Sequence, residues 1–443
     1  MARVLYWNIQ QFGINKVNSP YFNRRQIGST LNMQQASTQR LQYIMSTLIA
    51  NVPDIFVVVE TSTGAGAEGS LITAGGQQGA LYLLGRIRAN AAIAGNWRLV
   101  PPLILGQGGV SEGISVYYNS ANLHFSGPWG WQGAANPSDS VANIGAGNLV
   151  AYALPWNNSL PAVAVPAGSN INPGINSNRL AGQWQFRGAP PLGGGPGPLL
   201  NFPAIGNRPP FLTTFWEPAG GRTIKVFAYH APPHNPAARN GTNTISQIHE
   251  INNLGANEVA VVVGDFNVDI NSANAAGAYN NLIAAGYARH INPSPAPANY
   301  PVQGYVATHM KHSYRNGATP WNTNGYPAYG YAVTQYMGNN TSSIDNILTR
   351  YGGGGIGAPA NMTIVNRVAG SPYNRVMPIP AGAVPGALAY NSAMVLNGMG
   401  QPVALPLAGV VPGTVGALSN FRGWNNYGHI KSASDHMALV IDI

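Results

Sequence analysis

The 443-residue sequence predicts an α/β fold, because segments with strand-like and helix-like hydrophobic patterns alternate along most of the chain. Several strand segments are continuous runs of β-branched and aromatic residues, which is typical of strands buried on both faces. Two long blocks, residues 125–207 and 351–426, show little sustained periodicity of either kind. Because regular structure resumes after each block, we predict a single domain, residues 1–443, that carries two insertions.

The elements expected before the first block alternate strictly: strand, helix, strand, helix and strand, over residues 4–9, 34–50, 55–59, 79–92 and 114–118. The first helix is supported by apolar residues at i, i+3, i+4, i+7 and i+8 from Leu41, which give it one apolar face. Pro53 and Asp54 mark the turn before the second strand.

Between the two blocks the alternation continues. Strands are expected at residues 211–215, 223–229, 258–263 and 342–350, and helices at 244–254 and within 275–285. A final strand over residues 437–443 ends the sequence.

The charge balance favours a polyanionic partner such as a nucleic acid. Only 8% of the residues are charged, yet 22 basic residues stand against 13 acidic ones, which gives a formal net charge of +9. Eighteen of the basic residues are Arg, which can grip a phosphate with two hydrogen bonds. The alternative, that the basic charge only maintains solubility, stays open.

Cysteine is absent, so disulfides, thiolate zinc sites and a cysteine nucleophile are excluded. The N-terminal apolar run is too short for a signal peptide, and no stretch reaches the ~20 apolar residues of a membrane span. Low charge with many Asn, Gly and Pro residues suggests a bacterial protein exported without a recognisable signal peptide, a toxin or effector, although the localisation and the oligomeric state cannot be read from the sequence.

Five of the thirteen acidic residues stand at or next to the ends of expected strands, where side chains from several strands converge on one edge of a sheet: Glu60, Glu112, Asp265, Asp345 and Asp435. Oxygen ligands of this kind suit Mg²⁺, and Glu60, Asp435 and Asn8 are the candidate metal ligands. Each acid alone could equally cap a helix, stabilise a turn or form a salt bridge.

Two histidines also follow or precede strands, His230 after residues 223–229 and His436 directly after Asp435. A histidine held by a carboxylate keeps one tautomer and suits proton transfer or contact with an anionic transition state. For six other histidines, His309 among them, a surface or core position is the default expectation, and His234 is left undecided. Asp265 and Asn267 leave a buried strand at a sharp turn and could hold an attacking water, although both residue types also favour ordinary turns.

The order of these motifs resembles the endonuclease/exonuclease/phosphatase superfamily, and within it the deoxyribonuclease I and cytolethal distending toxin branch. The resemblance is carried by eight segments in the family's chain order: VLYWNIQQFG, DIFVVVET, SEGISVYYN, NRPPF, FAYHAPP, VVVGDFN, SSIDNIL and SASDHMALV. It implies a four-layer αββα sandwich and hydrolysis of phosphate esters with Mg²⁺ or Mn²⁺. The family's structural calcium sites cannot be located in this sequence.

The resemblance also implies a role for each motif residue. Glu60 would bind the metal, with Asn8 and Asp435 completing its coordination. Asp265 and Asn267 would orient the water. The pairs His436–Asp345 and His230–Glu112 would flank the scissile phosphate, and Asn8 and Arg208 would contact the substrate. Gln10 and Thr214 stand where deoxyribonuclease I has arginines, so some phosphate contacts must differ.

Three functions are compatible with the sequence. The first is a metal-dependent endonuclease that cuts DNA by water attack on the backbone phosphate. The second keeps the fold and takes a lipid head group, as a sphingomyelinase or phosphoinositide phosphatase does. Tryptophans of the first block could then dip into a membrane, although they could equally stack on bases or, as the better expectation, form a small local core. The third is a binding protein without activity, which the complete set of acids and histidines argues against.

Overall fold

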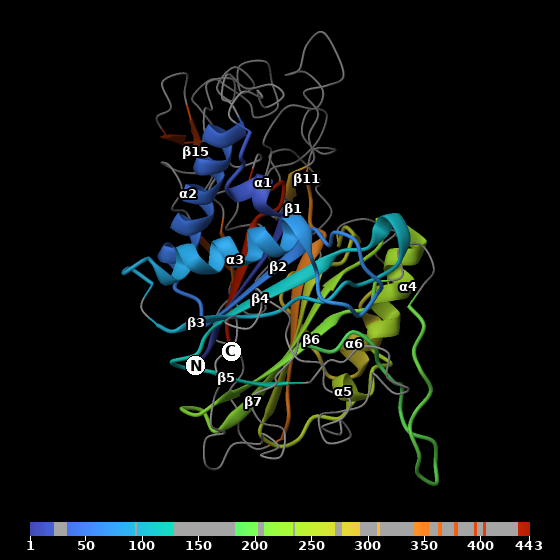
Figure 1. The fold of residues 1–443 in the computed structure, drawn as a ribbon. Helices are drawn as coiled ribbons and strands as arrows, with labels where there is room; N and C mark the ends of the chain where they lie inside the picture. The colour runs from blue at the N-terminus through green and yellow to red at the C-terminus, as the bar shows by residue number, and fades with distance from the viewer. Residues whose placement is uncertain are drawn as a thin grey trace, which may run out of the picture.

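Two mixed β-sheets pack face to face in the computed structural model (Figure 1). The structure describes the following residues: 1–21, 33–93, 95–127, 182–202, 208–233, 235–270, 277–292, 308–310, 341–353, 362–365, 376–379, 394–396, 402–404 and 433–443. Most of the two expected insertions therefore lies outside the described residues, and the expectation of a single domain stays a prediction.

The first sheet has seven strands in the order β14-β13-β17-β1-β2-β4-β3. Its strands are β1 (Arg3–Phe12), β2 (Ile55–Thr61), β3 (Trp97–Val100), β4 (Gly113–Asn119), β13 (Met362–Val365), β14 (Val376–Ile379) and β17 (Ala438–Asp442). β1 runs parallel to β2 and antiparallel to β17, so the last strand of the chain lies directly beside the first.

The second sheet has six strands in the order β5-β6-β7-β8-β12-β9. They are β5 (His124–Gly127), β6 (Phe211–Glu217), β7 (Arg222–His230), β8 (Glu258–Asp265), β9 (Ala288–Arg289) and β12 (Asp345–Tyr351). β7 and β8 are parallel, and β12 returns antiparallel to β8. Two short pairs accompany the sheets, β10 (His309–Met310) with β11 (Thr341–Ser342) and β15 (Met394–Leu396) with β16 (Pro402–Ala404).

Helices cover the outer face of each sheet, which gives the four layers that the motifs imply (Figure 1). The first sheet is covered by α1 (Ile14–Val17), α2 (Met33–Asn51) and α3 (Ala74–Arg88). The second is accompanied by α4 (Asn235–Ile245), α5 (His249–Asn252) and α6 (Asn280–Ala284). The α/β class and the αββα sandwich are therefore confirmed.

The core lies between the sheets and under the helices, and its composition explains why the strands form. β8 is buried from Val259 to Asp265, and β4 is buried along its whole length. Such strands are continuous apolar runs because both of their faces are covered. Between β1 and α2, the rings of Trp7 and Tyr43 meet edge to face with centroids 5.4 Å apart. Removal of this surface from water supplies the main driving force for folding.

The expected helix at 244–254 is wrong. The structure instead ends α4 at Ile245 and begins α5 at His249. In the gap, Ser246 Oγ donates to the carbonyl of Asn243 at 2.6 Å, and Asn252 Nδ2 donates to the carbonyl of Ser246 at 2.6 Å. Such side-chain bonds to the backbone compete with helical hydrogen bonds, so the helix stops.

Part of the first expected insertion is regular. β5 occupies His124–Gly127 and pairs with β6, and the extended segment near Gln183 bridges to Leu212 on β6. No helix among the described residues is both long and apolar enough to cross a membrane.

Candidate active site

A pocket of about 510 Å³ opens at the edge where the strand ends of both sheets meet. Eight of the residues singled out in the sequence line it: Glu60, Glu112, Arg208, His230, Asp265, Asn267, Asp435 and His436. The other two, Asn8 and Asp345, are buried behind this lining and contact it. The sheet topology is the cause, since β2, β7 and β8 end at this edge and β4, β12 and β17 begin there.

His230 stands at the end of β7, held by a carboxylate. Its Nδ1 lies 2.7 Å from Glu112 Oε2, and because a carboxylate only accepts, Nδ1 carries the proton. Arg208 donates to the same Glu112 oxygen at 2.9 Å and to the carbonyl of Ala231 at 2.9 Å. Arg208 is thus engaged with Glu112 and the backbone and steadies the His230 pair from behind.

His436, just before β17, is held in the same way by β12. Its Nδ1 lies 2.8 Å from Asp345 Oδ2. Two hydroxyls donate to that carboxylate, Tyr6 at 2.8 Å and Thr308 at 2.7 Å. The hydroxyl of Thr308 in turn accepts from the amide of Asp345 at 3.1 Å. Asp345 is therefore fixed on several sides, which fixes the ring of His436.

Asp265 lies between the two histidines at the end of β8. Its Oδ2 is 3.5 Å from His230 Nε2 and 3.6 Å from His436 Nε2. Asn8 donates to the same oxygen at 3.1 Å. Burial and the charge of Asp345 raise the pKa of Asp265 to about 6, although both histidines act in the opposite direction. The carboxylate is thus a base whose pKa lies close to neutral pH.

The two histidine pKa values also move away from the usual range. Burial would lower the pKa of His436, but the charges of Asp345 and Asp265 outweigh it and raise the value to about 10. For His230, burial again opposes, and the charge of Glu112 raises the pKa. His436 is therefore an imidazolium ion near neutral pH when no metal is bound, and the pKa of His230 lies above its usual value.

Glu60 leaves β2 with φ +61, a left-handed conformation that costs free energy in a residue with a Cβ. One carboxylate oxygen accepts from Asn8 Nδ2 at 3.0 Å and the other from the amide of Gln11 at 3.0 Å. Burial would raise the pKa of Glu60, but the charges of His230 and His436 and these bonds lower it. Glu60 is thus an ionised oxygen donor aimed into the pocket.

A divalent cation fits this donor set. Glu60, His230 and Asp265 each offer one ligand atom, and the three atoms lie within 4.8 Å of one another. Asn8 Oδ1 is buried and has no hydrogen-bond partner among the described residues, which costs free energy unless a donor or a cation binds its lone pairs. Mg²⁺ favours such carboxylate and amide oxygens. Asp435, the third predicted metal ligand, groups instead with His309 and His436.

Asn267 turns toward the pocket two residues beyond Asp265. Its amide donates to Asp265 Oδ1 at 2.9 Å, and its Nδ2 donates to the carbonyl of Ala231 at 2.8 Å. Its φ of 50 is the left-handed conformation that Asn tolerates best among residues with a Cβ. The GDFN turn thus aligns one carboxylate oxygen with a carboxamide whose nitrogen is already engaged.

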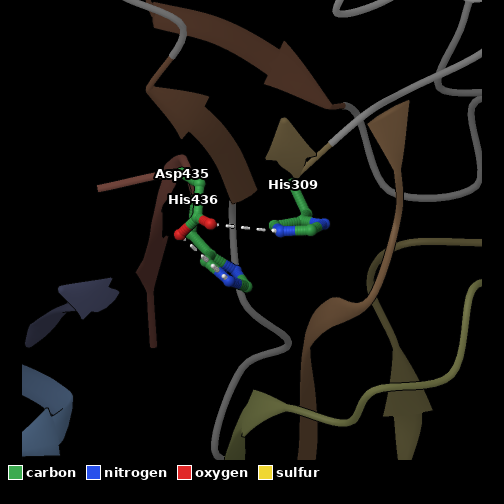
Figure 2. A group of neighbouring side chains, drawn as sticks. All are labelled: His309, Asp435 and His436. Carbon is green, nitrogen blue, oxygen red and sulfur yellow. Dashed lines mark ion pairs between the residues drawn. The ribbon is translucent and has the colours of Figure 1, made fainter. Parts of the chain in front are cut away.

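Sequence reasoning missed three residues of the site. Tyr6 and Thr308 hold Asp345, and His309 lies against His436 with ring centroids 4.4 Å apart (Figure 2). The sequence does carry a signal for Tyr6: residues i and i+2 of a strand share a face, and Asn8, two positions later, is a candidate metal ligand. His309 was expected on the surface or in the core, and the structure instead places it in the lining of the pocket. Burial and the charge of His436 lower its pKa.

Comparison with known proteins gives structural likeness only. No family model matches this chain, and no curated protein sequence matches it. Among solved structures, D. rerio TDP2 complexed with a single-strand DNA product has a TM-score of 0.41 and 9% identity, with 99% of this chain and 97% of that chain covered.

Two bacterial structures give similar figures. An endonuclease/exonuclease/phosphatase family protein from Leptotrichia buccalis has a TM-score of 0.39 and 10% identity, with 100% of this chain and 99% of that chain covered. The beta toxin of Staphylococcus aureus has a TM-score of 0.37 and 10% identity, with the same two coverages. The superfamily that the spaced motifs resemble is thus also represented among the solved structures to which this chain is similar.

Proposed function

We propose that this chain is a metal-dependent phosphodiesterase that cuts DNA internally by water attack on a backbone phosphate. One observation carries the proposal. Two histidines, each held through Nδ1 by its own carboxylate, point Nε2 at the same oxygen of Asp265 from 3.5 and 3.6 Å. A phosphate seated in the pocket would meet two hydrogen-bond donors and one general base together.

The chain's own residues divide the work. Asp265 accepts a proton from the attacking water as the bond from water oxygen to phosphorus forms, and Asn267 orients that water. The rings of His230 and His436 donate hydrogen bonds through Nε2 to the phosphoryl oxygens, where charge accumulates, and one of the two rings gives its proton to the leaving oxygen as the bond from phosphorus to that oxygen breaks. Glu60 and Asn8 would hold a divalent cation, which supplies Lewis-acid polarisation of the phosphate when it is bound.

The charge distribution supports a polyanionic substrate. Five of the thirteen acidic residues belong to this one site, and of the 22 basic residues only Arg208 is named in it, so the other eight acidic residues are outnumbered along the rest of the chain. A DNA strand would therefore be attracted to the molecule as a whole while the carboxylates stay grouped at the reacting phosphate. Added salt should weaken the binding of DNA strongly.

Supercoiled plasmid tests the proposal. The full chain is incubated with plasmid in a series of Mg²⁺ and Mn²⁺ concentrations, beside His436→Ala and a control, His249→Ala, which removes a histidine on α5 that is not part of the pocket lining. Nicking by the wild type and the control, with a loss of at least ~100-fold in His436→Ala, is expected. Equal nicking by all three proteins, or none, contradicts the proposal. Release of phosphocholine from sphingomyelin vesicles without nicking would assign a lipid substrate instead.

A further inference from the structure

A cluster of two imidazoles and one carboxylate lies on the His436 side of the pocket (Figure 2). His309, Asp435 and His436 each offer one ligand atom within 4.8 Å of the others. Asp435 Oδ2 is 3.6 Å from His309 Nε2, and Asp435 Oδ1 is 3.8 Å from His436 Nε2. Atoms bound to one tetrahedral ion at about 2.1 Å lie about 3.4 Å apart. Each histidine therefore lies within a few tenths of an ångström of that spacing from one oxygen of Asp435, and the three ligand atoms of one set lie within 4.8 Å of one another.

The backbone holds this cluster in place. His309 and His436 are joined by an antiparallel β-bridge, and the amide of Met437 donates to the carbonyl of Thr308 at 2.7 Å. Asp435 immediately precedes His436 and leads into β17. Two of the three ligands are thus fixed by pairing between distant parts of the chain, which lowers the entropy cost of assembling a metal site.

The orientation of His436 also suits a ligand. Its Nδ1 is occupied by Asp345 at 2.8 Å, so Nε2 is the nitrogen that faces Asp435. A histidine bound to a metal almost always has its second nitrogen held in this way by a carboxylate or carbonyl. All three residues line the pocket, which gives an ion a path of entry and leaves room for a water as a further ligand.

We propose that His309, Asp435 and His436 form a second cation site, distinct from the Glu60 group, that takes a divalent transition metal of the zinc type. Two imidazoles and one carboxylate match the preference of Zn²⁺ or Co²⁺, whereas Mg²⁺ takes oxygen ligands. A metal on His436 Nε2 occupies the nitrogen that also faces Asp265. Occupation of this site therefore inhibits any reaction that needs that nitrogen to contact the phosphate.

Metal binding without substrate tests this site independently of the proposed nuclease activity. The full chain is stripped of metal, saturated with Mg²⁺ to occupy oxygen ligands, and titrated with Zn²⁺ by equilibrium dialysis. Two variants, His309→Phe and His309→Gln, remove the ligand with an apolar and a polar side chain, and His249→Phe serves as the matched histidine control. Circular dichroism compares their folding with that of the wild type.

The wild type and His249→Phe should bind one Zn²⁺ that Mg²⁺ does not displace, and both His309 variants should bind it at least ~10-fold more weakly. Co²⁺ in the wild type should show the visible absorption of a four-coordinate ion with nitrogen ligands. Unchanged affinity in a folded His309 variant overturns the proposal. The proposal is also overturned if the wild type binds no Zn²⁺ in excess Mg²⁺, or if its Co²⁺ spectrum is typical of six oxygen ligands. Neither of these two results depends on the variants.

Discussion

Replacement of Asp345 by Asn tests the electrostatic reasoning about His436 most directly. The Asp345→Asn change keeps the size of the side chain and keeps one oxygen to accept from Tyr6. It places an amide nitrogen or an uncharged oxygen 2.8 Å from His436 Nδ1. An Asn amide donating to Nδ1 selects the tautomer with the proton on Nε2 and removes the charge that stabilised the imidazolium ion.

The size of the effect follows from the pKa. Asp345 is the first of the charges that bring the pKa of His436 from 6.5 to about 10, against the opposing effect of burial. At about 1.4 kcal/mol for each pH unit, the shift corresponds to about 5 kcal/mol in favour of the protonated ring, and Asp265 and Asp435 contribute part of it. Without Asp345, burial is opposed by Asp265 and Asp435 alone, and the pKa should fall from about 10 toward its usual value.

The raised pKa of His436 makes the free energy of unfolding depend on pH in a defined direction. Because the folded state holds a proton that the unfolded state loses near pH 6.5, the contribution is fully present below pH 6.5 and disappears as the pH rises to about 10. Over that interval the free energy of unfolding of the metal-free wild type should fall by up to about 1.4 kcal/mol per pH unit from this group. In Asp345→Asn that slope should be absent.

Two measurements on metal-free protein check the prediction. Histidine side-chain NMR follows the titration of His436, and urea unfolding between pH 6 and pH 10 follows stability. The control is Asp442→Asn, which breaks an ion pair with Arg3 at the end of β17 away from the pocket and should leave the titration unchanged. A titration midpoint near 10 in Asp345→Asn would refute the reasoning. Turnover of the plasmid should fall by as much as ~10⁴-fold, as when the carboxylate of a catalytic triad is replaced by an amide.

Three further predictions concern other parts of the site. Glu60→Gln should weaken Mg²⁺ binding at least ~10-fold in calorimetry while the circular dichroism spectrum stays unchanged, because it removes the ionised oxygen donor. Asp265→Asn should impair turnover more than Mg²⁺ affinity, and a large loss of binding with a normal rate at saturating metal would reverse that assignment. Tyr6→Phe should cost about 1.5–3 kcal/mol in urea unfolding, because its hydroxyl donates to the charged Asp345, whereas Tyr117→Phe, which loses a bond to a neutral carbonyl, should cost about 1 kcal/mol.

The strands that the sequence predicts correctly are those whose signal is local. β2, β4, β7 and β8 are continuous apolar runs, and each expected segment falls within the strand that forms. β3 and β5 were missed because strands of four residues are too short for a period to be recognised. Their formation depends on pairing with β4 and β6, which is a tertiary contact and not a local preference.

Among the site residues, too, only those with a local signal could be predicted from the sequence. Glu60, His230 and Asp265 could be predicted because each directly follows a recognisable strand, and strand ends converge at a sheet edge. Thr308 and His309 could not, because they act through contacts with residues 37 and more than 100 positions away. Their segment carries no periodicity that would place it against β17. Long-range pairing, not the composition of the segment, gives these two side chains their chemistry.

Different carboxylates of this site hold the histidines and offer a ligand to the candidate metal position, so the orientation of the rings and metal binding do not depend on the same carboxylates. Glu112 and Asp345 are each committed to a histidine Nδ1, and Asp265 faces both Nε2 atoms. A cation held by Glu60 and Asn8 would therefore leave these two carboxylates beside the rings whose pKa values they raise. If the same cation were held by Glu112 or Asp345, the nearby ring would lose the charge that raises its pKa. The arrangement thus provides separate carboxylates for a cation at Glu60 and for the two histidines, whereas an ion on His436 itself would occupy the Nε2 that faces Asp265.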